Sequence, residues 1–339
     1  MDTVAKQSSR ERAELFQASE GRHAPHIAAP IIEKDFWVCW TLHRLFGVLK
    51  FRPQLIFKGG TSLSKVFNAI ERFSEDVDLS LSRRDLGFAD DHDPEQNGIS
   101  KKEIRRRLEA LTNKCLETVR ERLLPELHRD FASVLGTSGW TLKLDDQDQQ
   151  TIIFEYPHSE LSGSLRYVRP AIRLEMGARS DDWPAIDAEI KPYAAEDFPK
   201  AFTAPACSVR TLAAERTFWE KATLLHAEYH RPAGKHAAER LSRHYYDLYR
   251  LLVHDIGQRA IGQQDLLKRV VQHKQLFFAQ AWANYETAKP GTFHLLPDKT
   301  RMENLKRDYA AMQDMIFGNA PDWESIIGEL ARLEGRLNA

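Results

Sequence analysis

Two neighbouring segments of this chain determine the fold that the rest of it can adopt. They are Phe57-Lys58-Gly59-Gly60-Thr61-Ser62-Leu63-Ser64-Lys65 and Arg72-Phe73-Ser74-Glu75-Asp76-Val77-Asp78-Leu79. The first follows a short apolar run at 55–57 and continues with helical spacing, which predicts a strand, a glycine turn and a helix. The second alternates polar and apolar residues from Asp76 to Leu81, which predicts another strand. A helix predicted over 30–49 precedes both segments.

The glycine turn has the composition of a phosphate-binding turn. Gly59 and Gly60 allow the backbone to approach a ligand, and the helix start and the hydroxyls of Thr61 and Ser62 offer hydrogen bonds. It is not a Walker A loop, because Ser64 stands where the second glycine must precede the lysine, and it does not fit the dinucleotide fingerprint. Glycines also occur in strand-to-helix turns for steric reasons alone, so the turn by itself leaves both interpretations open.

The second strand carries two carboxylates on one face. Asp76 and Asp78 are two residues apart, so their side chains leave the strand on the same side. At a spacing of about 7 Å two ionised groups repel by roughly 2 kcal/mol at an effective dielectric constant near 20. A divalent cation such as Mg²⁺, which binds carboxylate and phosphate oxygens together, would relieve that repulsion. The alternative is a solvated edge strand, because Asp91/Asp93 and Asp146/Asp148 have the same spacing.

A phosphate-binding turn, a helix and a strand with paired aspartates together are what metal-assisted nucleotidyl transfer needs, since that chemistry depends on positioning and charge neutralisation. Such a site calls for a third carboxylate on a neighbouring strand. Glu175 is the candidate, in a predicted strand whose other face carries Ile172, Leu174 and Met176. The alternative for Glu175 is a surface ladder with Arg173.

The charge balance, the cysteines and the lengths of the apolar segments exclude several classes of protein. The chain has 339 residues, 42% hydrophobic and 29% charged, with 48 Lys plus Arg against 49 Asp plus Glu. This balance excludes a polycationic nucleic-acid binder but permits a local basic patch. The three cysteines form no CxxC pair, which favours a reducing compartment over a zinc or disulfide framework. With no apolar segment long enough for a signal peptide or a membrane span, we expect a soluble, cytoplasmic protein that does not bind a membrane.

The pattern along the chain predicts an α+β domain followed by a helical domain. Residues 1–27 read as a polar, poorly ordered lead-in, and residues 28–205 as the α+β domain, with a helical insertion near 101–130. Further strands are predicted at 140–144, 151–156 and 166–176, and four prolines indicate a connecting stretch at 184–207. Residues 206–339 read as the helical domain, with Ser208 as the N-cap of its first helix.

These motifs resemble the nucleotidyltransferase toxin family typified by AbiEii and AbiGii, a branch of the polymerase-beta-like superfamily. FKGGTSLSK (57–65) followed by RFSEDVDLSL (72–81) carries the resemblance. EKDFW (33–37) resembles the N-terminal helix of the family, and ERTFWEK (215–221) and SRHYYDLY (242–249) resemble its C-terminal motifs. The resemblance covers roughly residues 31–250, in the expected order.

The resemblance implies a polymerase-beta-like nucleotidyltransferase sheet with flanking helices and a C-terminal helical domain. It implies a Mg²⁺-dependent enzyme that moves a nucleotide from an NTP to an RNA, as the toxin of a toxin–antitoxin or abortive-infection system, where relatives modify the tRNA 3′ end. The implied catalytic residues are Asp76, Asp78, Lys221, Asp247 and Glu175, with Asp76, Asp78 and Glu175 binding the metal. The implied nucleotide-binding residues are Lys58, Gly59, Gly60, Thr61, Ser62, Lys65 and Ser74. A cognate antitoxin is a further implied partner.

Two departures from the family pattern bear on this site. Some branches have aspartate directly after the arginine of the last motif, where this chain has His244. The third acid also varies among branches.

The C-terminal motifs and the basic run have alternative interpretations. Lys221 lies at the edge of an apolar stripe, where it can face a triphosphate, pair with a distant carboxylate or remain solvated; no acid stands three or four residues away. Tyr245, Tyr246 and Tyr249 can pack in a core or stack on bases. The basic run at 101–107 can bind RNA phosphates or form a solvated helix face.

Three functions therefore remain in view. The first is nucleotidyl transfer to RNA, and the second is transfer to a hydroxyl of a protein or a small molecule. The third is a non-catalytic nucleotide-binding or antitoxin-binding module, against which the presence of Asp76, Asp78, Lys221 and Asp247 argues.

Overall fold

The chain forms two compact units in the computed structural model. Unit 1 contains Met1–Val66 and Phe73–Leu212, and unit 2 contains Phe67–Arg72 and Ala213–Ala339. The structure describes residues 1–49, 51, 53–74, 76–161, 170–235 and 240–339.

Unit 1 is built on a mixed seven-stranded sheet in the order β3-β4-β5-β2-β1-β7-β6. Its strands are β1 (Leu55–Lys58), β2 (Asp76–Leu81), β3 (Thr141–Leu144), β4 (Thr151–Glu155), β5 (Ala171–Gly177), β6 (Ala185–Ile190) and β7 (Cys207–Leu212). β2 runs parallel to β5 and antiparallel to β1, so the strand before the glycine turn and the strand with the paired aspartates lie in the middle of the sheet. This sheet with flanking helices confirms the α+β class.

The period-two alternation of β2 and β5 explains their central position. Val77 and Leu79 on β2 are fully buried, as are Ile172 and Leu174 on β5. One face of each strand therefore enters the core, and the acidic residues between these positions face the other way. The predicted strand at 166–176 corresponds to β5, and its residues 166–169 lie outside the described residues.

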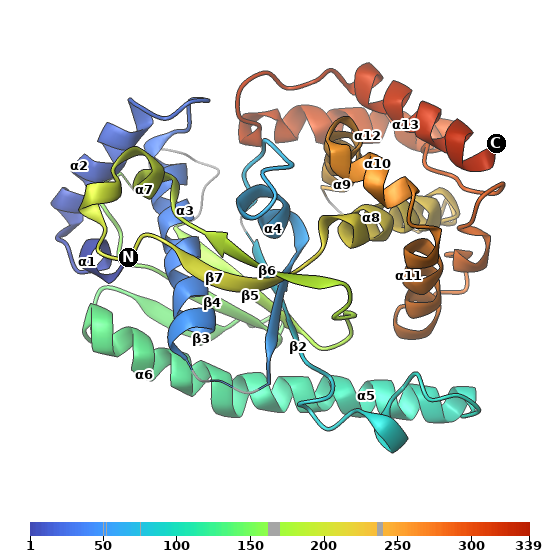
Figure 1. Cartoon of the computed structure of the whole chain (residues 1–339), viewed down its shortest axis with the longest axis horizontal. Coiled ribbons are helices and arrows are strands. Elements are labelled where there is room, and N and C mark those ends of the chain that lie inside the picture. The colour runs from blue at the N-terminus through green and yellow to red at the C-terminus, as the bar shows by residue number, and fades with distance from the viewer. Residues whose placement is uncertain (50, 52, 75, 162–169, 236–239) are drawn as a thin grey trace. The chain divides into compact units, whose positions relative to one another are not determined.

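The helices of unit 1 flank this sheet. They are α1 (Asp2–Ala5), α2 (Ser9–Glu20), α3 (Ala29–Leu42), α4 (Gly59–Lys65), α5 (Lys101–Thr118), α6 (Leu124–Leu135) and α7 (Tyr193–Asp197). A π-helical turn, Val119–Leu123, joins α5 to α6, so that the two form one long helix (Figure 1). Shorter segments are the π-helical turn His43–Val48 and the 3-10 turns Asp90–His92 and Pro199–Ala201.

Residues 1–27, expected to be a poorly ordered lead-in, contain the two helices α1 and α2. A capping box between Ser8 and Glu11 begins α2, whose Phe16 is fully buried and lies 5.7 Å from the ring of Phe36 on α3. Few apolar residues were visible in this stretch. They suffice because α3 is buried along nearly its whole length and offers apolar surface to α2.

Residues 184–207 were expected to be a connection, but they contain β6 and the start of β7. Pro184 and Pro205 precede strands and Pro192 caps α7, so these prolines lie at the ends of elements and do not interrupt them. Ser208 lies within β7 and caps no helix. The helical region therefore begins at Ala214.

Unit 2 is helical. Its helices are α8 (Ala214–Tyr229), α9 (Ser242–Val253), α10 (Asp255–Ile261), α11 (Gln264–Phe277), α12 (Lys299–Met312) and α13 (Trp323–Asn338), with 3-10 turns at Tyr285–Thr287 and Gln313–Met315. Trp219 is fully buried and donates from Nε1 to the carbonyl of Ala260 at 3.0 Å. Tyr245 and Tyr246 are also buried, which favours core packing over base stacking for these two. Among the described residues of both units, no helix has the length and apolar character that crossing a membrane requires.

Candidate active site

Three carboxylates lie side by side on one face of the sheet of unit 1. Asp78 on β2 is directly opposite Glu175 on β5, and Asp76 is opposite Arg173. The three acidic side chains are between a quarter and two fifths exposed. Neighbouring strands of a sheet lie about 4.8 Å apart, so side chains at paired positions on one face are neighbours. The register therefore unites the three residues that were expected to bind metal, and we call them the carboxylate cluster.

Position 59 favours glycine because the carboxylate of Asp78 lies close to it. It follows β1 directly, has a φ of +77°, and an added Cβ would lie 1.9 Å from Oδ2 of Asp78. The positive φ alone disfavours other residues, and the contact leaves no room for a methyl group. Lys58 lies opposite Asp78 on β1, with Nζ 3.5 Å from Oδ1. The sequence suggested only that glycine serves a phosphate or a turn; the geometry adds that it makes room for Asp78.

The hydroxyls of the turn are directed to the backbone of unit 1. Thr61 donates to the carbonyl of Asp76 and also, at 3.3 Å, to that of Ser74, while Ser62 donates to the carbonyl of Gly59 at 2.9 Å. Both side chains are buried. In this structure they tie the turn to the start of β2, whereas Gly60 and Ser74 are partly exposed.

Lys65 lies in the interior of unit 1. Its ammonium is 2.8 Å from Oδ1 of Asp35 and 3.6 Å from the centre of the Tyr193 ring, and its side chain is 5% exposed. Burial favours the neutral amine, but the charge of Asp35 outweighs it and raises the pKa of Lys65. As it stands, this predicted phosphate ligand pairs with a residue of the EKDFW segment and does not face solvent.

A positively charged side chain lies among the acids of the carboxylate cluster. Nε of Arg173 is 3.7 Å from Asp76 and 3.8 Å from Glu175, and its Nη1 is 2.6 Å from Oδ2 of Asp145. Burial, and then the charges of Asp78 and Asp76, raise the pKa of Glu175. The excess of negative charge is therefore expressed on Glu175 even with Arg173 present.

The donor set fits a hard divalent cation. Asp76, Asp78 and Glu175 offer only carboxylate oxygens, which are the ligands that Mg²⁺ prefers, and the three lie on one face of two paired strands. Within the described residues, no three His, Cys, Asp or Glu side chains already converge closely enough to hold a metal ion. Binding would therefore require side-chain adjustment within the cluster.

Unit 2 holds a second charged cluster, which we call the Lys221 cluster. Asp247, fully buried, accepts two hydrogen bonds from Arg72 at 2.7 and 2.8 Å and one from Lys221 at 2.7 Å. Nδ1 of His244 is 3.4 Å from Nζ of Lys221. Of the alternatives for Lys221, the structure therefore has the ion pair with a distant carboxylate.

The pKa shifts in the Lys221 cluster follow from burial and charge. Burial would raise the pKa of Asp247, but Arg72 and Lys221 outweigh it and hold that pKa below its usual range. Burial, followed by the charges of Lys221 and Arg243, lowers the pKa of His244 well below its usual value. A neutral His244 accepts a hydrogen bond from Lys221. Arg72 and His244 were not predicted: Arg72 is 175 residues from Asp247, and His244 was noted only as a departure from the family pattern.

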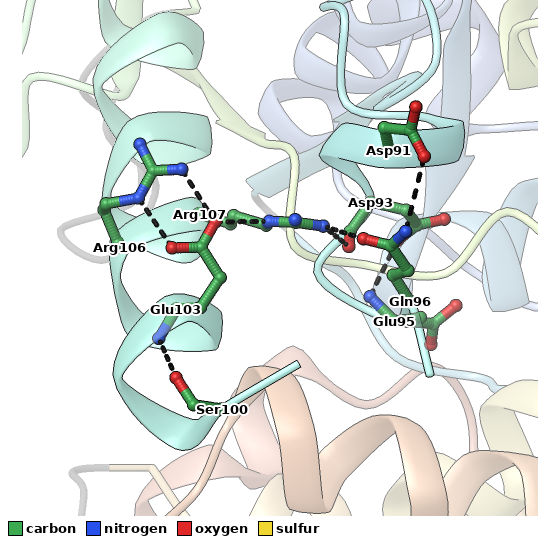
Figure 2. A network of polar contacts seen from close by, with 8 residues as sticks. All are labelled: Asp91, Asp93, Glu95, Gln96, Ser100, Glu103, Arg106 and Arg107. Carbon is green, nitrogen blue, oxygen red and sulfur yellow. Dashed lines mark hydrogen bonds and ion pairs between the residues drawn. The ribbon is translucent and has the colours of Figure 1, made fainter. Parts of the chain in front are cut away.

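Two arginines of the basic run on α5, Arg106 and Arg107, pair with the same acid, Glu103. Figure 2 shows Arg107 between Glu103 and the loop before α5, where it donates to the Asp93 carbonyl at 2.7 Å and to Gln96 at 2.8 Å. Arg106 forms a two-bond pair with the same Glu103, yet its side chain is 69% exposed. Arg107 is thus a structural tie, and Arg105 and Arg106 are the exposed arginines of the run.

Comparison with known proteins identifies the family to which this chain belongs. A family model described as nucleotidyl transferase AbiEii toxin, type IV TA system, matches residues 40–329. Among solved structures, the chain is similar to MenT4, a nucleotidyltransferase toxin from Mycobacterium tuberculosis H37Rv. The TM-score is 0.46 and the sequence identity 16%, over 97% of this chain and 99% of that chain. No curated protein matches this chain significantly. The family match contains both charged clusters.

Proposed function

Because this chain belongs to the AbiEii nucleotidyltransferase toxin family of type IV toxin–antitoxin systems, we propose that it transfers a nucleotide from an NTP to an RNA acceptor, the 3′ end of a tRNA. The observation that supports this most directly is the carboxylate cluster. Asp76 and Asp78 share one face of β2, Glu175 lies across from Asp78, and Gly59 makes room for Asp78. A family implication and an independent geometric arrangement therefore point to the same residues.

In this proposal Asp76, Asp78 and Glu175 hold Mg²⁺. When bound, the cation neutralises charge on the triphosphate and on the reacting oxygens. Lys58, already 3.5 Å from Asp78, supplies a further positive charge, and the backbone of Gly59 and Gly60 gives the phosphates close approach. Ser74, partly exposed, can add a hydroxyl.

We assign the Lys221 cluster to binding negative charge in the same reaction. Two cations, Arg72 and Lys221, share the single carboxylate of Asp247, while His244 is neutral. In this assignment Lys221, which pairs with Asp247, is the cation that would approach a phosphate group. Asp247 holds both cations in place and, in this assignment, acts as a positioning residue.

Two arginines on α5 are candidates for contact with the RNA acceptor. Arg105 and Arg106 are exposed on α5 and can contact RNA phosphates. Single-stranded RNA ends present unstacked bases and a flexible backbone, so they suit an enzyme better than a base inside a duplex. The second candidate, transfer to a protein or small-molecule hydroxyl, would use the same carboxylate cluster. A cognate antitoxin is the further partner that the family implies.

The experiment is incubation of the full chain with each labelled NTP, Mg²⁺ and total RNA. We expect label in tRNA for at least one NTP, and loss of labelling in excess chelator and in Asp78→Asn. Asp187→Asn is the matched control, because Asp187 is an exposed strand aspartate on β6, 69% exposed and outside the cluster. Label in protein bands and never in RNA would favour the second candidate, and equal labelling by Asp78→Asn would contradict the metal site.

A further inference from the structure

Arg173 is positioned to interact with three carboxylates, and they are not equivalent. Its closest contact is Nη1 to Asp145 at 2.6 Å, whereas Nε lies 3.7 Å from Asp76 and 3.8 Å from Glu175. The first distance is that of a strong charge-assisted hydrogen bond, and the other two are those of loose ion pairs. The guanidinium is therefore drawn toward Asp145 while its charge still acts on the carboxylate cluster.

Asp145 is held rigidly for this purpose. It follows β3, and its backbone N–H donates to the carbonyl of Thr151 at 2.8 Å. Oδ1 accepts from the N–H of Gln147 at 2.9 Å, which leaves Oδ2 for Arg173. The Asp145 side chain is only 13% exposed, so the pair is partly shielded from water. Asp145 is thus a fixed anchor and Arg173 the adjustable partner.

The position of Arg173 follows from the sheet. It lies on β5 between Asp76 on β2 and Ile153 on β4. The planar guanidinium has separate donor edges, so one edge can face Asp145 while the other faces the cluster. A lysine at this position would have a single charged point and could not bridge both sides.

We propose that Arg173 is a built-in counter-ion that competes with a divalent cation for the carboxylate cluster, and that Asp145 sets the outcome by holding Arg173 away from it. Asp145 is in this view a positioning residue that acts only through Arg173. The proposal rests on the proposed metal site and adds a determinant of its affinity. No bond is made or broken; one cation replaces another beside the same oxygens.

The test measures binding of Mn²⁺ alone to the full chain, by electron paramagnetic resonance or calorimetry, without nucleotide. Arg173→Gln removes the competing charge and should tighten Mn²⁺ binding by about tenfold, the lower end for residues supporting a metal site. Asp145→Asn keeps the acceptor for Gln147 but frees Arg173 to approach the cluster, and should weaken binding by about tenfold. Asp146→Asn, an exposed neighbour with the same change of charge, should leave binding unchanged.

The double variant is decisive. If Asp145 acts through Arg173, Arg173→Gln combined with Asp145→Asn should bind Mn²⁺ as Arg173→Gln does, with the Asp145 effect abolished. Additive effects, unchanged binding in both single variants, or weaker binding in Arg173→Gln would each overturn the proposal. Unchanged melting temperatures in all variants guard against misfolding. If wild type binds Mn²⁺ no better than Asp78→Asn, the metal site itself fails, and this proposal fails with it.

Discussion

The two charged clusters differ in their exposure to solvent and in the distances between their charged groups. The carboxylate cluster of unit 1 is partly exposed, has acids in excess and holds its cations at 3.5–3.8 Å. The Lys221 cluster of unit 2 is buried, and its hydrogen bonds from Arg72 and Lys221 to Asp247 are 2.7–2.8 Å long. A loose anionic group can admit a cation with little cost to the fold, whereas a tight buried group must remain complete. Substitutions in the carboxylate cluster should therefore mainly reduce activity, and substitutions in the Lys221 cluster should mainly reduce stability.

The largest effect should come from Asp247. Replacing it with asparagine leaves the buried charges of Arg72 and Lys221 without their carboxylate, and should lower the free energy of unfolding by about 3–5 kcal/mol. Asp78→Asn, in the partly exposed cluster, should change that free energy by no more than about 0.5 kcal/mol and still abolish transfer. Urea unfolding of both variants checks the contrast. Equal losses of stability would remove the distinction between the clusters.

Unit 2 should also be the more acid-sensitive of the two. Burial, then the charge of His230, lowers the pKa of His226 to about 4. The unfolded chain binds a proton near pH 6.5 and the folded chain only near 4, so His226 contributes stability fully above pH 6.5. That contribution, on the order of 3 kcal/mol, should be lost as the pH falls from 6.5 to 4. The measurement is the free energy of unfolding at pH 7.5 and pH 5, compared with His226→Asn, whose dependence should be flatter.

Gly59→Ala tests whether the close packing of Gly59 against Asp78 is needed for the carboxylate cluster to bind metal. The positive φ and the contact with Asp78 should cost about 1–3 kcal/mol and displace the carboxylate. Mn²⁺ binding should weaken along with transfer. Gly87→Ala is the control: it has a comparable positive φ, and nothing lies within 4 Å of its added Cβ. A metal affinity that is equally reduced in both variants would show that the backbone, and not the carboxylate, is responsible.

The smallest effects should come from the basic run. Arg106→Gln removes an exposed charge, should change stability by under about 0.5 kcal/mol, and should lower the salt dependence of RNA binding by about one phosphate contact. Arg107→Gln should instead loosen residues 93–96, since Arg107 ties them to α5. Filter binding at several salt concentrations and hydrogen exchange across 83–100 separate the two outcomes. An unaltered salt slope in Arg106→Gln would exclude this arginine from the RNA contact.

Local patterns were enough to predict the centre of the sheet. The alternation of β2 and β5 identified the buried face and put Asp76, Asp78 and Glu175 on the other. Residues of one strand share a face by geometry alone, so no tertiary information was needed for that step. The register that places Glu175 opposite Asp78 depends on how the strands pair, and it became visible only in the fold.

Contacts distant in sequence could not be predicted in this way. The pairing of Lys65 with Asp35 and of Arg72 with Asp247 depends on which helices pack together, and no short motif encodes that. The same limit explains the lead-in: Phe16 is buried because α3 is beside it. The strands β6 and β7 were missed because prolines at element ends resemble prolines in loops.

The contact between Gly59 and Asp78 couples the evolution of two positions of the chain. A Cβ at position 59 would overlap the carboxylate of Asp78 in its present position, so a side chain there would force that carboxylate to move. Whether a substitution at one of these positions is tolerated therefore depends on the residue at the other. A lineage that lost the acid at 78 would lose the constraint that this contact places on position 59, while the positive φ would still favour glycine there.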